Sequence, residues 1–232
     1  MRCYFQGTLD YACGIYAVIN ALSCTHGLDL AGARRILQDL FETLPENPAL
    51  WRAFVRNETD HYWLIRQGLS RWCLGPRWKY RAEQPFSDCL MPEQDWAGLE
   101  GVSAYLPEQE APRGPASTET AGNEARAVWA VLQSWFESPL AKDDRQRRVA
   151  ILRFHRFLPG MAQPVISHWT TVSGIQGNVL MLQDASSERH AIRSISKVDC
   201  ISASFSLSMI RIVPESVILL ERPGMCEILH PV

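Results

Sequence analysis

Several features that define common protein classes are missing from this chain of 232 residues. Its seven cysteines include no Cys-x-x-Cys pair, the spacing typical of zinc sites and redox pairs, and an odd number cannot pair completely within one chain. No apolar run approaches the roughly 20 residues of a membrane-spanning helix. The amino-terminal segment MRCYFQGTLDYACG also lacks the apolar core of a signal peptide. We therefore expect no membrane association and a reducing, cytoplasmic location in which most cysteines are small buried apolar residues.

The chain also lacks a large excess of positive or negative charge. The chain has 23 Lys and Arg against 25 Asp and Glu, a formal net charge of -2, so it lacks the clustered positive charge of a broad nucleic-acid surface. Hydrophobic residues make up 47% and charged residues 21%, which is the balance of a globular protein and not of a disordered one. We expect a single globular domain over residues 1–232 that binds no nucleic acid.

The apolar spacing predicts helices in the first part of the chain. Asn47 and Pro48 form an N-cap signal, whereas prolines break any period over residues 73–98. Residues 107–123 contain no large apolar side chain, and we expect an exposed, mobile loop there. The predicted helices span residues 13–23, 30–44, 47–55, 60–72 and 123–137.

Short runs rich in β-branched residues follow residue 142 and predict strands. Gln176-Gly177-Asn178 is typical of a hairpin turn between two of them. A helical half over residues 1–141 and an antiparallel half over residues 142–232 make an α+β fold with an active site between the halves. The predicted strands span residues 149–157, 165–175, 179–183, 191–194, 207–213 and 216–221.

Cys13 stands at the start of the first predicted helix, in the segment Gln6-Gly-Thr-Leu-Asp-Tyr-Ala-Cys13-Gly14. A helix start presents free amides and the positive end of the helix dipole, which together lower a thiol pKa. Gly14 removes side-chain bulk beside the sulfur, so a substrate carbonyl can approach the backbone. The side-chain amide of Gln6 and the Cys13 N–H would form an oxyanion hole. Asp10 lies on the entry loop, where we expect it to position the loop or contact substrate.

The second segment with chemical character runs from His168 to Asp184. His168 lies in a predicted strand and Asp184 ends the return strand, so the hairpin would bring their side chains together as a base and its orienting acid. Trp169 would shield their hydrogen bond from water or contact substrate, although a strand tryptophan is more often core packing. Asp184 also suits a second role, capping a turn before Ala185-Ser186-Ser187. His61, His155 and His190 are the competing histidines, but no comparable hairpin to an aspartate follows them.

Gln-x6-Cys-Gly at a helix start, followed much later by His on a strand and Asp beyond a hairpin, resembles the papain-like cysteine peptidases, and among them the bacterial C39-like peptidases. The resemblance implies a papain-like fold and hydrolysis of a peptide bond through an acyl-enzyme. It assigns Cys13 as nucleophile, His168 as general base, Asp184 as its partner and Gln6 as oxyanion donor. No metal or cofactor is implied, and the expected partner is a protein or peptide substrate, including a ubiquitin-like or glycine-rich tail.

The same machinery serves other acyl transfers, and the sequence leaves them open. An isopeptidase acting on ubiquitin-like proteins, a peptidoglycan amidase toxin and a transglutaminase all fit the four residues. A papain-like module that binds peptides without catalysis is the alternative from another class.

Overall fold

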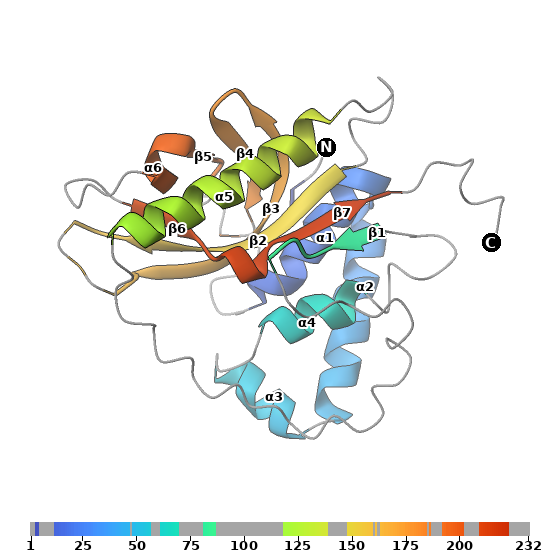
Figure 1. The fold of residues 1–232 in the computed structure, drawn as a ribbon. Coiled ribbons are helices and arrows are strands. Elements are labelled where there is room, and N and C mark those ends of the chain that lie inside the picture. The colour runs from blue at the N-terminus through green and yellow to red at the C-terminus, as the bar shows by residue number, and fades with distance from the viewer. Residues whose placement is uncertain are drawn as a thin grey trace.

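The computed structural model describes residues 3–4, 12–46, 48–56, 61–69, 81–86, 118–138, 148–159, 161, 163–184, 186, 192–201 and 209–222. Within these ranges the chain has an α+β architecture, with most helices ahead of most strands (Figure 1). The helices are α1 (Cys13–His26), α2 (Leu30–Thr43), α3 (Pro48–Val55), α4 (His61–Gly68), α5 (Thr118–Glu137) and α6 (Lys197–Ile201), with short 3-10 turns η1 (Leu44–Glu46) and η5 (Pro214–Ser216). None of these helices is both long and apolar enough to cross a bilayer.

The described strands form one antiparallel sheet in the order β1-β7-β2-β3-β4-β5, with β6 also paired to β2. β2 is long enough for two partners along one edge: β7 pairs with its first half and β6 with its second half. The turn η5 separates β6 from β7, and Ser216 in that turn accepts a hydrogen bond from Arg153 N at 2.8 Å. The strands are β1 (Arg81–Glu83), β2 (Arg148–Phe157), β3 (Ile166–Gln176), β4 (Val179–Asp184), β5 (Ser194–Ser196), β6 (Met209–Ile212) and β7 (Ile218–Glu221).

Helices cover both faces of the sheet (Figure 1). α1 packs with α2–α4 against one face, in an apolar cluster that includes Ile151 and Trp169. α5 and α6 pack against the other face, in a second cluster that includes Leu152 and Phe154. Successive side chains of a strand point to opposite faces, so the near-continuous apolar run of β2 supplies both clusters.

α1 is the central helix, and it is buried on almost every side. The predicted apolar stripe is present, but Ala17, Asn20 and Ala21 are buried too, because α1 lies between the sheet and the helices α2 and α4. Thr171 on β3 donates to the carbonyl of Ala17 at 2.6 Å and ties the helix to the sheet. Small side chains let the helix approach its neighbours on both sides, so burial all round follows from tertiary packing.

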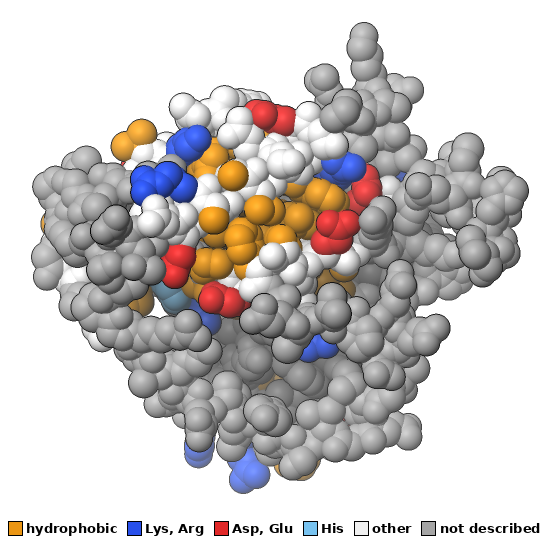
Figure 2. Space-filling view, viewed as in Figure 1, with side chains coloured by type: hydrophobic (Ala, Val, Ile, Leu, Met, Phe, Trp, Pro, Cys, Tyr) orange, Lys and Arg blue, Asp and Glu red, His pale blue; other side chains and the backbone are white. Residues whose placement is uncertain are grey.

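α5 crosses the opposite face as an amphipathic helix. Trp129 and Leu132 are buried, whereas Ala127 and Ala130 are exposed. Figure 2 shows this side of the molecule, with apolar side chains across the middle and charged side chains around them.

The prediction of a loop over residues 107–123 is wrong in its last part, because α5 begins at Thr118. Residues 107–117 lie outside the described residues. The first six residues of α5, 118–123, have small or polar side chains. They can still be helical, because the later turns of the helix provide its apolar burial.

Three further differences concern short elements. Residues 81–83, predicted as irregular, form β1 against β7. The strand predicted over residues 191–194 occurs at Ser194–Ser196 instead, and Cys200 lies in α6, where no helix was predicted. Elements of three to five residues have too little periodicity of their own, so their neighbours decide their conformation.

Candidate active site

Cys13 is the first residue of α1, as predicted. Ala12 is the N-cap residue and has no side-chain oxygen to occupy the first amides of the helix. Its carbonyl accepts from Ile15 N at 2.9 Å and Tyr16 N at 3.0 Å. The amides of Cys13 and Gly14 precede the first i to i−4 hydrogen bond of the helix, and the positive end of the dipole lies at the same place. The Cys13 thiol therefore lies in an environment that stabilises a negative charge on its sulfur.

His168 lies within reach of both predicted partners. Its Nε2 is 2.7 Å from Asp184 Oδ1, and its ring also hydrogen bonds with the Cys13 thiol. Because Nε2 is occupied by Asp184, Nδ1 is left to face the sulfur. Cys13, His168 and Asp184 are 7%, 6% and 2% exposed, so the three groups meet in a largely desolvated site.

The register of the β3–β4 hairpin places His168 and Asp184 on one face. Asp184 pairs with Thr170, and His168 is two residues from Thr170, so both side chains project from the same side. A β-bulge between Val172 and Gly174 shifts the register by one residue. Without the bulge Asp184 would pair with Thr171, whose side chain points to the opposite face. β4 ends at Asp184, which pairs with Thr170, so the pairing of β3 with β4 stops two residues before His168.

Backbone amides and a hydroxyl hold Asp184 on both of its oxygens. Oδ1 accepts from Ser186 N at 3.1 Å and Ser186 Oγ at 3.2 Å, and Oδ2 accepts from Ile192 N at 2.6 Å. Ser186 Oγ also lies 3.3 Å from His168 Nε2. Asp184 therefore both caps the following turn and partners the histidine, so the two roles inferred for it coexist. Ser186 and Ile192 were not predicted; the Asp-x-Ser spacing signals the first contact, whereas nothing local signals the second.

The segment around Tyr4 is anchored beside the same site. Asn20, fully buried on α1, accepts from Tyr4 N at 2.8 Å and donates to Tyr4 O at 3.1 Å. Its amide also lies 3.3 Å from the Gln183 carbonyl at the end of β4. Cys3 donates to the Asp184 carbonyl at 3.4 Å. One buried asparagine thus joins α1, the amino-terminal segment and β4 next to the acid.

The electrostatics of the pair favour its charged form. Burial lowers the pKa of His168, but its hydrogen bonds with Asp184 and Cys13 and the nearby charges outweigh this effect and raise that pKa to about 9. Burial raises the pKa of Asp184, yet His168 and the amides of Ile192 and Ser186 leave it below its usual value. At neutral pH the imidazole is therefore protonated, and its positive charge favours a thiolate at Cys13.

The other described cysteines lack this arrangement. Cys3, Cys13, Cys24 and Cys200 are all free thiols. Burial is the main cause that raises the pKa of Cys3 to about 11 and those of Cys24 and Cys200 to about 12. These three thiols stay protonated at neutral pH, so they match the expectation of inert structural cysteines.

The remaining predicted site residues divide into described and undescribed ones. Gly14 is buried in the first turn of α1. Trp169 is 4% exposed and packs in the cluster around α1, on the other face of β3 from His168. Gln6 and Asp10 lie outside the described residues, as do the side chains of the competing histidines His61 and His190.

His155 is the described competitor of His168. It pairs with Ser167 and therefore points to the other face of the sheet. Burial, followed by Arg153 and Arg211, lowers its pKa to about 4. It is neutral and has no carboxylate partner among the described residues.

The chain matches no protein-family model, no curated protein and no solved structure. Over the described ranges, no group of three or more His, Cys, Asp or Glu side chains is arranged to hold a metal ion. The site brings together a thiol, an imidazole and a carboxylate, with the imidazole in contact with both of the others.

Proposed function

We propose that this protein is a cysteine peptidase of papain-like fold that hydrolyses peptide or isopeptide bonds through an acyl-enzyme on Cys13. One observation carries the proposal: His168 hydrogen bonds with the Cys13 thiol and with the Asp184 carboxylate at once. A nucleophile, a base and an orienting acid in this order are the parts that covalent catalysis of acyl transfer requires. The α+β arrangement, in which the start of α1 meets strand β3 of an antiparallel sheet, supports the papain-like fold.

In the first half of the reaction, the Cys13 thiolate attacks the substrate carbonyl carbon and forms a carbon–sulfur bond. The carbonyl oxygen becomes an oxyanion, which the Cys13 amide at the helix start and, in this proposal, the Gln6 amide stabilise. One such donor is typically worth about 2.7–4 kcal/mol in the transition state. The protonated imidazole of His168 then gives its proton to the nitrogen of the scissile bond. The carbon–nitrogen bond breaks, the amine leaves and a thioester remains.

In the second half, neutral His168 takes a proton from water as the water oxygen attacks the thioester carbonyl. The carbon–sulfur bond breaks, the carboxylic acid leaves, and the thiolate and imidazolium are restored. Asp184 stays ionised throughout because two backbone amides and a hydroxyl donate to it. Its task is to hold the imidazole in one orientation and to stabilise its charge.

Thiol alkylation tests the proposed state of Cys13 without knowledge of the substrate. With iodoacetamide at neutral pH, Cys13 should react faster than Cys24 and Cys200 in the same molecule, because a thiolate is the reactive form. Asp184→Asn should slow this reaction and lower peptide hydrolysis by roughly a hundredfold, the scale of a general acid–base contribution. An amide also cannot accept hydrogen bonds at both positions where the Asp184 carboxylate does. Peptide mapping by mass spectrometry measures each site.

Asp199→Asn is the matched control for this change. Asp199 on α6 also accepts a serine hydroxyl hydrogen bond, from Ser196 at 2.7 Å, but α6 packs mainly with α5, β5 and β6. It should leave the alkylation rate of Cys13 unchanged. Faster labelling of Cys24 or Cys200, or hydrolysis that survives Cys13→Ala, would reject the proposal. Transfer to added amines in place of water would instead assign the enzyme as a transglutaminase.

A further inference from the structure

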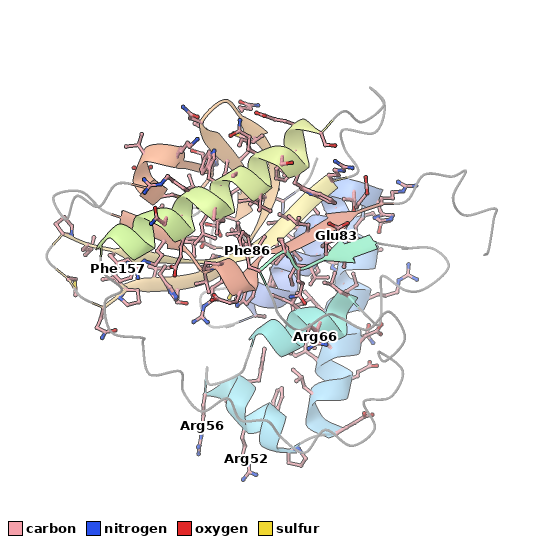
Figure 3. The ribbon with its side chains drawn as sticks, in the orientation of Figure 1. Arg52, Arg56, Arg66, Glu83, Phe86 and Phe157 are labelled. Atoms are coloured by element: carbon pink, nitrogen blue, oxygen red, sulfur yellow. The ribbon has the colours of Figure 1, made fainter. Side chains whose placement is uncertain are left out.

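Exposed apolar side chains cluster on the connection between β2 and β3. Nine large apolar side chains in the described ranges are exposed, and four of them lie in the short stretch 158–166. We call these four the apolar ledge: Leu158, Met161, Val165 and Ile166, each between 40% and 45% exposed. Phe157, at the end of β2, marks their place in Figure 3. Single exposed apolar residues are ordinary, but a cluster indicates a binding surface.

The apolar ledge adjoins the candidate active site. Ile166 is the first residue of β3 and lies two residues from His168, so both side chains project from the same face of the sheet. β2 supports this part of β3 through the pairs Arg156 with Ile166 and Phe154 with His168. The Phe154 ring meets the imidazole edge-on, with 5.9 Å between ring centroids. The ledge therefore continues the strand face that carries the proposed base.

A positive charge, that of Arg156, lies beside the apolar ledge. Between Arg148 and Gln183 the sequence contains no Asp or Glu. Arg156 pairs with Ile166 and projects from the face of His168. Arg153 and Arg211 pair with Trp169 and His155 and therefore project from the opposite face. A ligand on this surface meets aliphatic side chains with the guanidinium group of Arg156 beside them.

The reaction itself determines which part of a substrate comes here. This step rests on the proposed function, in which Cys13 holds the acyl group and His168 gives a proton to the leaving nitrogen. The leaving segment must therefore lie on the His168 side of the sulfur and pass the residues that flank His168 on β3. We infer that the apolar ledge, with Arg156 beside it, binds the leaving segment of a peptide substrate and selects large aliphatic side chains close to an acidic one.

Cleavage of a peptide pool tests this inference. The pool is a proteolytic digest of a cell lysate with its amines blocked, and new amino termini are read by mass spectrometry. For the wild type, Leu, Ile, Val and Met together with Asp or Glu should be enriched severalfold at the first positions after the cleaved bond. The double variant Leu158→Ser/Ile166→Thr should lower kcat/KM about tenfold for peptides with aliphatic residues there, the usual scale for lost apolar contacts. Peptides with Gly or Ala at the same positions should be unaffected.

Matched variants separate the contribution of Arg156 from that of the apolar ledge. Arg156→Gln should remove the acidic enrichment and keep the aliphatic one. Val55→Ser, at an exposed apolar residue of α3 away from the ledge, should change neither. The alkylation rate of Cys13 should be the same in all these variants; a slower rate in the double variant would show that the ledge acts through the site's integrity, against the inference.

The outcomes distinguish a failure of this inference from a failure of the proposed peptidase function. Cleavage whose new termini follow the composition of the pool, or a pattern unchanged by the double variant, rejects the inference alone. No cleavage by the wild type rejects the proposed hydrolysis, and the inference with it.

Discussion

At the scale of single residues, the His168–Asp184 pair shows how hydrogen bonds outweigh desolvation. Burial by itself would make the histidine neutral and the acid protonated. Instead the pKa of His168 is raised to about 9 and that of Asp184 is lowered, because each group hydrogen bonds with the charged form of the other. The same sheet provides the contrast: His155, half-buried beside Arg153 and Arg211, has its pKa lowered to about 4.

The raised pKa of His168 predicts a dependence of stability on pH. Unfolding returns the imidazole to its ordinary pKa of 6.5, so its contribution should be complete below that value and should disappear as pH rises through about 9. The difference corresponds to about 3 kcal/mol. Urea unfolding of the wild type and His168→Gln, at about pH 6 and about pH 10, should show the gap between the two proteins closing on the alkaline side.

His155→Gln supplies the control for this measurement. Because the pKa of His155 is lowered, its effect is confined to the acid side, between 6.5 and about 4, where protonation favours unfolding. At about pH 6 the wild type should therefore be slightly less stable relative to His155→Gln than at about pH 10, a change of opposite sign to that expected for His168. A gap between wild type and His168→Gln that stays constant, or widens with pH, would contradict the charged pair.

At the scale of elements, the β3–β4 hairpin positions the site through two backbone features. Gly177 in its turn has φ 56, a conformation that side chains with a Cβ adopt at a cost. The bulge near Ser173 then shifts the register so that Asp184 faces the same way as His168. The turn is apparent in the sequence as Gly-Asn between two β-rich runs. The bulge is not, because one unpaired residue leaves no mark on apolar alternation that is already interrupted by Ser173 and Gly174.

Two glycines of this hairpin allow a matched test of the turn. A Cβ on Gly177 or on Gly174 would meet no atom within 4 Å, but only Gly177 has a positive φ. Gly177→Ala should lower the free energy of unfolding by about 1 kcal/mol, whereas Gly174→Ala should stay within about 0.5 kcal/mol of the wild type. Thermal and denaturant unfolding measure both. Equal effects of the two substitutions would show that backbone conformation at the turn is not what Gly177 contributes.

The longer elements were predictable, because their periodicity was strong. The type and approximate bounds of α1, α2, β2 and β3 follow from apolar spacing and cap residues. α5 was predicted to begin at Asn123, and its earlier start at Thr118 depends on residues that add little burial. β1 and α6 are short and form against neighbouring strands and helices, so their own residues carry no sufficient signal.

At the scale of the whole molecule, one sheet separates two apolar cores. The cluster around α1 and the cluster around α5 and α6 share no side chain, although β2 contributes to both. Arg148 fastens β2 at its start: it bonds Glu221 at 2.8 Å and the Trp135 carbonyl at 3.0 Å, and its guanidinium lies 4.5 Å from the Trp135 ring. α5, β2 and β7 are thereby joined where the two layers meet.

Substitutions in the two cores should therefore be independent in energy. Ile19→Val on α1 should cost about 0.5–1.5 kcal/mol and Leu132→Ala on α5 about 2–5 kcal/mol. Because they lie on opposite faces of the sheet and share no apolar contact, the double variant should equal their sum within about 0.5 kcal/mol. A double-mutant cycle in urea measures the coupling. A coupling well above that limit would show that the cores exchange strain through β2.

The sequence by itself determined the kinds of the main elements, the placement of Cys13 at a helix start and the pairing of a histidine strand with an aspartate strand. These depend on residues close together in the chain, whose periodicity, caps and turn residues act locally. Only the tertiary structure decided that α1 is buried on all sides, that the bulge turns Asp184 toward His168, and that Ile192 holds the second carboxylate oxygen. It also placed the apolar ledge on the strand face of the base. Each of these depends on contacts between distant segments, which local patterns do not encode.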